Sequence, residues 1–434
     1  MPTRLGAVTA PHPIPDPSLV ASLRGLDRDG RLLFAMRTLR MFGYGFLAVV
    51  LVLYLAAAGL DPLAIGLVLT LTLVGDAIIS LWLTTNADRL GRRRVLVIGA
   101  ALMVVAGVAF AFTSWVPLLI VAGAIGVVSP TGNEVGPFLA VEQAALTQTT
   151  ADARRTAIFA WYNLVGYVAT ATGALGAGLL SQGLLDGGLA PVDAYRAIVL
   201  GYAVIGIAMA LGFWRLSGAI EAPPAQVATD GIRRRFGLGR SKGVVLKLSA
   251  LFSIDAFGGG FIPQSLMAYW FHLQYGVEPA VLGAIFFGAN LLAAVSSLSA
   301  ARIAARFGLI NTMVFTHIPS NVLLILVPVM PTLPLAIAVL LLRFSLSQMD
   351  VPTRQSYVMA VVEPDERSSA AGVTGIARTT GAAISPSISS VLVASAGYAA
   401  LPFYLAGGFK ILYDLLMYRE FRSVRPPEEQ ARRG

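Results

Sequence analysis

The chain has no cysteine, which excludes disulfide bonds and thiol chemistry from its 434 residues. Histidine is scarce as well, and no two of His12, His272 and His317 have the spacing of metal ligands. The sequence contains no phosphate-binding glycine loop, nucleophile elbow or metal-binding cluster. We therefore expect no enzymatic activity, no bound metal and no cofactor.

Charged residues are also few, at 13% of the chain, whereas hydrophobic residues make up 56% and the mean hydropathy is +0.74. This is not the composition of a soluble domain. A bilayer-spanning helix needs about 20 apolar residues, and the chain has room for a dozen. We predict an all-α polytopic membrane protein with 12 transmembrane helices, at residues 38–58, 63–84, 94–114, 117–141, 157–180, 195–214, 248–271, 279–301, 309–330, 334–361, 369–395 and 399–418.

The distribution of positive charge predicts the topology. The net charge is +9, from 32 basic and 23 acidic residues, and such an excess can indicate nucleic-acid binding. Here the basic residues fall in alternate connections, which stay on the cytoplasmic side of a membrane, so we expect no nucleic-acid partner. We predict a multi-pass protein of the inner (plasma) membrane with both termini cytoplasmic; the inner connections carry Arg89, Arg92–Arg94, Arg154, Arg155, Arg302, Arg306 and Arg367.

A charged interval divides the apolar runs into two sets of six. We predict a tail at 1–30, a first bundle at 31–215, a linker at 216–246, a second bundle at 247–419 and a tail at 420–434. The linker contains Arg233–Arg235, for which we expect solvent and anionic lipid heads as partners. A regulatory or partner-binding role for this linker is the alternative.

The two sets repeat each other at a spacing of about 217 residues. Gly59–Gly66 matches Gly276–Gly283, in the first outer turn of each set. Ala87–Gly91 likewise matches Ala304–Gly308, although the acid is lost in the second copy. We interpret the chain as a duplication of a six-helix unit.

The segment Asn86–Arg94 is a strongly basic loop between the second and third apolar runs. Its Asp88-Arg89-Leu90-Gly91-Arg92-Arg93 resembles the signature loop between helices 2 and 3 of the major facilitator superfamily. One departure is Thr84, where the family usually has Gly. The resemblance implies two six-helix bundles related by a pseudo-two-fold axis along the membrane normal, with a substrate site between them.

The resemblance also implies a conformational gate. In the family, Asp88 would cap the inner end of helix 11 and Arg92 would reach an acid near the end of helix 4, for which Glu142 is the candidate. These contacts would hold the outward-facing state. On the alternative interpretation the motif only anchors topology; its residues are Asp88, Arg89, Gly91, Arg92 and Arg93.

Ionisable side chains inside the predicted spans are expected to have a structural or functional role, because burying each one costs at least about 2.5–3.5 kcal/mol at the bilayer centre. On the tenth run we expect Arg343 near midplane and Asp350 two turns further on the same face. Arg354 follows Asp350 at a spacing suited to an ion pair. The remaining candidates are Arg40, Asp76, Glu134, Asp255 and Arg378.

The family resemblance places helices 1, 4, 7 and 10 around a central cavity, and with them Arg40, Glu134, Asp255, Arg343 and Asp350. We expect Arg343, with Arg40 or Arg378, to attract an anionic or zwitterionic substrate. One of Glu134, Asp255, Asp350 and Asp76 would then carry a proton, since burial can raise the pKa of a carboxyl towards neutrality. The alternative is that all these charges form fixed ion pairs between helices.

The functional hypothesis is a secondary active transporter that moves a small organic molecule by alternating access, with proton-coupled efflux as the first choice. Uptake or exchange of an organic anion is the runner-up. A membrane receptor or lipid-handling protein without transport is the alternative from another class. The expected partners are a small-molecule substrate, protons and membrane lipid, with the chain acting as a monomer.

Overall fold

The computed structural model describes residues 26–149, 155–222, 239–363 and 366–424, and these ranges contain helices and no strands. Most of each predicted tail and much of the predicted linker lie outside the described residues, and the described parts of the tails include the start of α2 and the end of α17. The first half consists of α2 (Arg28–Ala57), α3 (Pro62–Leu90), α4 (Arg92–Phe112), α5 (Val116–Ile125), α6 (Phe138–Thr149), α7 (Arg155–Asp186) and α8 (Pro191–Trp214). The second half consists of α10 (Lys242–Gly260), α11 (Gln264–Tyr275), α12 (Pro279–Phe307), α13 (Leu309–Leu326), α14 (Leu333–Phe344), α15 (Asp350–Val361), α16 (Arg367–Ala394) and α17 (Leu401–Phe421).

Every predicted apolar run contains helix, but the fourth, seventh and tenth runs are interrupted. The interruptions lie between α5 and α6, between α10 and α11, and between α14 and α15. Irregular backbone at membrane depth is tolerated where protein covers it or where it lines a cavity. The break in the tenth run also invalidates the prediction that Arg343 and Asp350 share one face, since no continuous helix connects them.

The predicted basic loop Asn86–Arg94 is wrong, because α3 continues to Leu90 and α4 begins at Arg92. Gly91 alone joins the two helices, with a φ of 95° that a side chain would oppose. The second half has the same joint at Gly308, with a φ of 87°. Since α3 and α12 are both 29 residues long, this geometry agrees with the predicted repeat.

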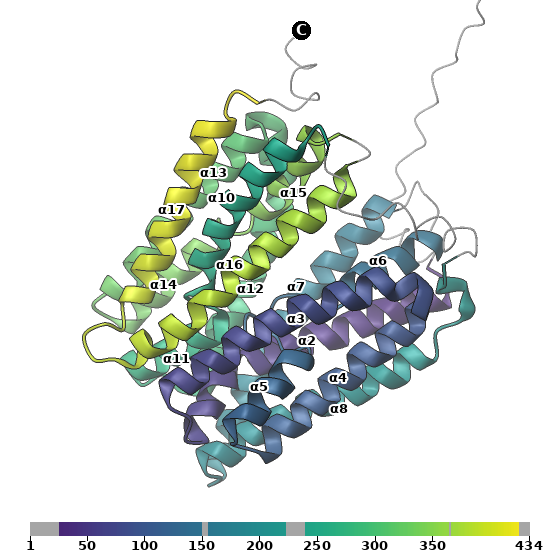
Figure 1. The fold of residues 1–434 in the computed structure, drawn as a ribbon. Coiled ribbons are helices and arrows are strands. Elements are labelled where there is room, and N and C mark those ends of the chain that lie inside the picture. The colour runs from purple at the N-terminus through teal and green to yellow at the C-terminus, as the bar shows by residue number, and fades with distance from the viewer. Residues whose placement is uncertain (1–25, 150–154, 223–238, 364–365, 425–434) are drawn as a thin grey trace, which may run out of the picture.

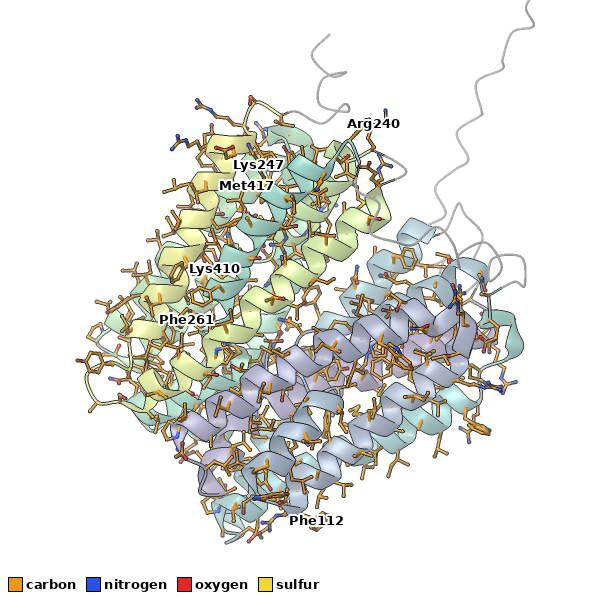
Figure 2. The ribbon with its side chains drawn as sticks, in the orientation of Figure 1. Phe112, Arg240, Lys247, Phe261, Lys410 and Met417 are labelled. Carbon is orange, nitrogen blue, oxygen red and sulfur yellow. The ribbon has the colours of Figure 1, made fainter. Side chains whose placement is uncertain are left out.

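Eight helices of the described chain are long and apolar enough to cross a membrane. The helices α16 and α17 have 28 and 21 residues but are more polar, and α17 carries Lys410 and Asp414. With the broken pairs α5–α6 and α14–α15, the arrangement is consistent with twelve crossings. Large apolar side chains face outward, among them Phe112, which is 74% exposed (Figure 2).

The two halves form two bundles that lie at an angle to each other (Figure 1). We call the end that carries Gly91, Gly308 and Phe421 the basic end, and the end that carries Asp61 and Glu278 the opposite end. The ribbons of the two halves diverge towards the basic end in Figure 1.

Close contacts between the halves lie towards the opposite end. A Cβ on Gly178 of α7 would lie 2.8 Å from the Cα of Gly283 on α12, so these helices cross backbone to backbone. Thr70 Oγ1 of α3 lies 2.6 Å from Ser387 Oγ of α16. These contacts hold the two halves together at the opposite end.

Candidate functional site

A cluster of buried charges lies in the first half. We call it the first-half cluster, and it consists of Arg37, Arg40, Glu134, Glu142 and Tyr162. Arg40 is fully buried; its Nη1 and Nη2 donate to the two oxygens of Glu142 at 2.5 and 2.6 Å, and its Nε donates to Glu134 Oε1 at 2.9 Å. Arg37 pairs with Glu134, and the Tyr162 hydroxyl donates to Glu142. Two cations therefore neutralise the buried Glu142 and the half-buried Glu134, which reduces the cost of burying each charge.

The break between α5 and α6 positions this cluster. Glu134 lies in the non-helical stretch, where Ser129 Oγ donates to Asn133 O at 2.7 Å. Arg37 and Arg40 are three residues apart on α2, so they project from one face of that helix. The guanidinium of Arg40 also lies 4.7 Å from the ring centroid of Phe138, at the start of α6.

The non-helical stretch between α5 and α6 also contacts Asp76 of α3. Its Oδ1 accepts a hydrogen bond from the backbone N–H of Gly136 at 2.8 Å and one from Ser80 Oγ at 3.1 Å. Asp76 therefore links α3 to the non-helical stretch that holds Glu134. Among the described residues it forms no salt bridge with a basic side chain.

A second cluster lies in the other half and has Asp255 at its centre. Asp255 Oδ1 accepts from Lys410 Nζ of α17 at 2.7 Å, and its Oδ2 accepts from Arg354 Nη1 of α15 at 3.1 Å. The same nitrogen donates to Asp350 Oδ2 at 3.0 Å, so the predicted pairing of Arg354 with Asp350 is confirmed. Figure 2 shows Lys410 partway along this half, away from Lys247 and Arg240 at the basic end. The second-half cluster comprises Asp255, His317, Asp350, Arg354, Arg378, Lys410 and Asp414.

His317 on α13 connects two acids of this cluster. Its Nδ1 lies 2.9 Å from Asp414 Oδ1, and its Nε2 lies 4.0 Å from Asp255 Oδ1. Asn321 Nδ2 donates to the other oxygen of Asp414 at 3.3 Å. A carboxylate only accepts, so Nδ1 carries a hydrogen, and a second proton on Nε2 would give His317 a charge facing Asp255. With His317 neutral, the three acids and three permanent cations of the cluster balance.

Arg343 and Arg378 are less completely paired. Arg378 Nη1 lies 3.9 Å from Asp255 Oδ2, and this buried nitrogen has no hydrogen-bond partner among the described residues. Arg343 Nε is also buried without a hydrogen bond in the described part of the chain. The guanidinium of Arg343 lies 4.9 Å from the ring centroid of Phe344. Cationic hydrogen-bond donors therefore remain available in the second half.

The basic motif makes contacts that differ from those the resemblance implied. Arg92 Nε donates to Asp88 Oδ1 at 2.8 Å, and its Nη1 donates to the carbonyls of Ile220 and Ala144 at 3.1 and 3.3 Å. Glu142 belongs to the first-half cluster instead, because it lies against Arg40. The prediction that Arg92 reaches Glu142 is therefore wrong.

Asp88 is paired with Arg92 at the α3–α4 joint rather than capping α16. Of the other motif residues, Arg89 is exposed, Gly91 forms the joint, and Arg93 Nη1 donates to Leu216 O at 3.2 Å. The helices α3 and α16 instead contact each other through Thr70 and Ser387, towards the opposite end.

Two carboxylates fasten the segments that flank the linker. Glu221 accepts from the backbone N–H groups of Arg92 and Arg93 at 2.6 and 3.2 Å, at the start of α4. Glu366 accepts from the N–H groups of residues 239, 240 and 241, just before α10, at 2.7–3.0 Å. These hydrogen bonds, that of Ser241 first, hold the pKa of Glu366 below its usual value. Each acid thus fixes one flank of the linker to its own half.

Sequence reasoning singled out no role for His317, Lys410 and Asp414. Lys410 and Asp414 are the charges within the predicted span 399–418, so the cost of charge in hydrocarbon was a signal that could have found them. His317 lies within an apolar run as well, where an ionisable ring carries the same signal. Among the described residues, no group of three or more His, Cys, Asp or Glu is placed to hold a metal ion.

Comparison with known proteins identifies the family. A model of the Major Facilitator Superfamily matches residues 33–379 and 251–434. An uncharacterized membrane protein of Saccharomyces cerevisiae, YJR124C, is 32% identical over 436 residues, covering 94% of this chain and 97% of the yeast protein.

Solved structures agree in fold. A D-xylose-proton symporter has a TM-score of 0.69 at 16% identity, covering 90% of this chain and 97% of that one. The nucleoside transporter NupG has a TM-score of 0.67 at 15% identity, covering 91% and 100%. A bacterial homologue of the human lysosomal transporter Spinster, inward-facing and occupied, has a TM-score of 0.69 at 16% identity, covering 91% and 97%. The chain therefore belongs to the major facilitator superfamily.

Proposed function

We propose that this chain is a proton-coupled secondary active transporter that moves a small organic molecule by alternating access, with efflux as its direction. The observation that supports it best is the placement of a compensated charge cluster in each of two halves that contact each other towards the opposite end. Family membership and the solved neighbours support secondary transport. Alternating access requires that such halves tilt and expose a central site to one side at a time.

We propose that the basic end faces the cytoplasm, because basic connections are retained there. The motif at Gly91, with Arg92 and Arg93, and its counterpart Arg306 beside Gly308 all lie at that end. The state described here would then be the one open to the cytoplasm. Contacts such as that of Thr70 with Ser387 would close the outer side.

Proton coupling is supported by the way the second-half cluster is built. A proton on Asp255 or Asp350 would weaken the hold on Arg354, and a proton on His317 would strengthen its hold on Asp255. Proton uptake would therefore rearrange the contacts of α10, α13, α15 and α17. In the first half, a proton on Glu134 would release Arg37 and one contact of Arg40.

A two-step experiment tests this proposal. The purified chain is screened by thermal shift against a metabolite and drug panel, and stabilising compounds are added to proteoliposomes that contain a pH-sensitive dye. We expect such compounds to change the internal pH, and to do so much less after Glu134→Gln with Asp350→Asn or after His317→Gln. The matched control is Glu363→Gln, an exposed acid outside the clusters. Exchange of a compound without any pH change would refute proton coupling, and binding without exchange would favour a receptor.

An organic anion is the second candidate substrate, favoured by the incomplete pairing of Arg343 and Arg378. A buried donor without a partner is costly, and an anionic ligand would satisfy it. We expect Arg343→Ala to weaken binding of anionic compounds at least tenfold while cationic compounds lose much less. Titration calorimetry with charged pairs of similar shape measures this, and Arg343→Lys should restore part of the affinity. Equal losses for both charge types would reject the anion hypothesis.

A further inference from the structure

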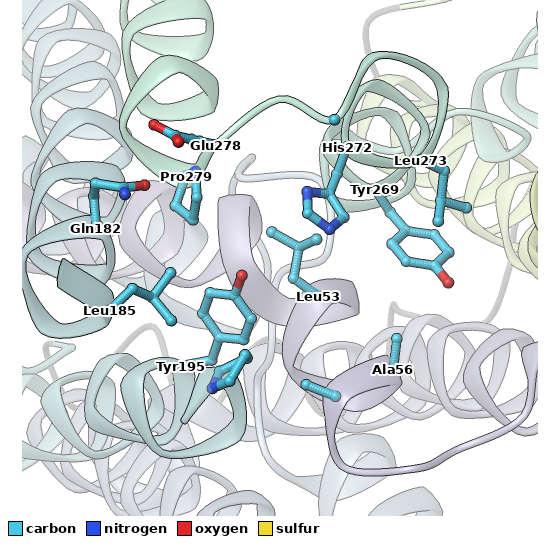
Figure 3. A pocket seen from close by; sticks show the side chains of 13 residues that line it. Leu53, Ala56, Gln182, Leu185, Tyr195, Tyr269, His272, Leu273, Glu278 and Pro279 are labelled. Atoms are coloured by element: carbon cyan, nitrogen blue, oxygen red, sulfur yellow. The ribbon is translucent and has the colours of Figure 1, made fainter. Parts of the chain in front are cut away.

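A pocket of about 460 Å³ lies at the opposite end and is bounded by both halves (Figure 3). Residues of α2, α7 and α8 line one side of it, and residues of α11, the turn after it and the start of α12 line the other. A volume of this size suits a small molecule. The pocket shares no residue with either charge cluster or with the basic motif, so it is separate from the site described above.

Three polar side chains of the pocket offer hydrogen-bond acceptors. His272 Nδ1 lies 2.9 Å from the carbonyl oxygen of Val277, so it must donate there, and Nε2 of the neutral ring is left as an acceptor. Gln182 donates through Nε2 to Asp186 at 2.9 Å, while its Oε1 is buried without a partner among the described residues. Glu278 precedes α12 and forms no side-chain cap. Each of these three groups can accept a hydrogen bond from a ligand, and Gln182 Oε1 is the one that is buried.

The rest of the lining is aromatic and aliphatic. Tyr195 and Tyr269 lie on opposite sides of the pocket in Figure 3, with Leu53 between them. None of the thirteen lining residues is Lys or Arg, so no fixed cation opposes a positive ligand. Aromatic faces and a carboxylate together attract an ammonium group, and apolar walls take up the body that carries it.

We propose that this pocket binds a small amphiphilic amine, with its ammonium group directed to Glu278, Gln182 and His272. Because both halves contribute to the lining, a bound amine stabilises the arrangement in which their opposite ends are together. By stabilising this arrangement the amine would keep the halves apart at the basic end and slow turnover. This locking step rests on the proposed alternating access, whereas the binding of the amine does not depend on it.

The first experiment measures binding to the full-length purified chain by titration calorimetry with tryptamine and with tryptophol, its uncharged analogue. We expect tryptamine to bind at least tenfold more tightly, and Glu278→Gln to remove most of that preference. Gln182→Leu should also weaken tryptamine binding. Asp61→Asn is the matched control: Asp61 is the repeat counterpart of Glu278, lies outside the lining, and Asn still caps α3.

Equal binding of the two compounds, or an undiminished preference in Glu278→Gln, would overturn the assignment of the site.

The second experiment places spin labels at Thr85→Cys and Ala371→Cys, exposed positions on α3 and α16 towards the basic end. The chain has no other cysteine, so this pair alone is labelled. Tryptamine should shift the distances towards the longer population. Binding with unchanged distances would reject the locking step, whereas the proteoliposome assay judges transport separately.

Discussion

At the scale of single residues, Arg40 illustrates how charge is kept inside an apolar bundle. Its guanidinium is fully buried and contacts Glu134 and Glu142. Removing one member of a buried ionic group typically costs about 3–5 kcal/mol, because the remaining charge is left uncompensated. We therefore expect Arg40→Met to destabilise the chain by that amount, as measured by chemical unfolding in detergent.

A double variant separates charge from packing in this prediction. If the cost arises from uncompensated acid, Arg40→Met with Glu142→Gln should lose less stability than the sum of the single changes. Thr38→Ala, at an exposed position on the same helix, should leave stability within about 0.5 kcal/mol of the parent. An additive result would mean that Arg40 acts mainly by filling space.

The candidate charges were predictable from sequence by one rule, which is that a charge within an apolar run requires compensation. That rule found Arg40, Glu134, Asp255 and Asp350, all of which form ion pairs in the structure. Helical spacing gave one partner, Arg354 for Asp350, but the distant partners could not be predicted, because the pairing of Asp255 with Lys410 joins residues 155 positions apart. Such contacts depend on how helices pack, and packing leaves little trace in the local pattern.

At the scale of elements, the apolar runs predicted helices well and predicted their interruptions poorly. Residues 126–137 remain partly apolar, so a hydropathy average does not reveal that Val127 takes a φ of 51° or that α5 ends at Ile125. The basic loop was expected because four arginines follow one another closely, yet Gly91 lets the chain turn within a single residue. A high density of charge indicates that a segment lies at the membrane surface, but it does not indicate whether that segment is a loop or a helix.

The joint between Glu366 and the start of α10 gives a prediction with a defined pH dependence. The pKa of Glu366 is depressed by hydrogen bonds from Ser241 and its two predecessors. A depressed folded-state pKa means that the contribution to stability is present above the usual value of 4.5 and is lost as the pH falls through the folded value. The amides of residues 239–241 should therefore be protected from hydrogen exchange at pH 7, and this protection should fall as the pH is lowered below 4.5.

Glu366→Gln should speed this exchange at pH 7, and its difference from the parent should shrink in acid. Glu363→Gln provides the control, since this neighbouring side chain is exposed. The same protection in Glu366→Gln and parent at pH 7 would show that the carboxylate does not fasten this end of the linker.

At the scale of the whole molecule, the contact between Thr70 and Ser387 offers a test of the arrangement. Their hydroxyl oxygens lie 2.6 Å apart on helices from different halves. Thr70→Cys with Ser387→Cys should form a disulfide under mild oxidation and reduce transport to background, with recovery after reduction. The bond is detected by the change in gel mobility after protease cleavage between the halves.

Each single cysteine variant should remain insensitive to the oxidant, because the chain has no other thiol. Full transport in the cross-linked protein would contradict a mechanism in which α3 and α16 must separate at this end. Failure to form the bond would instead contradict the contact itself.

The joints at Gly91 and Gly308 restrict what length changes the chain can accept. Each is a single residue that couples two long helices without slack. One residue added within the first turn of the following helix would rotate the rest of that helix by about 100° about its own axis, since an α-helix has 3.6 residues per turn. The side chains of α4 or α13 beyond the insertion would then face different neighbours. We therefore expect a one-residue insertion directly after Gly91 or Gly308 to prevent folding, whereas a longer surface turn would accommodate it.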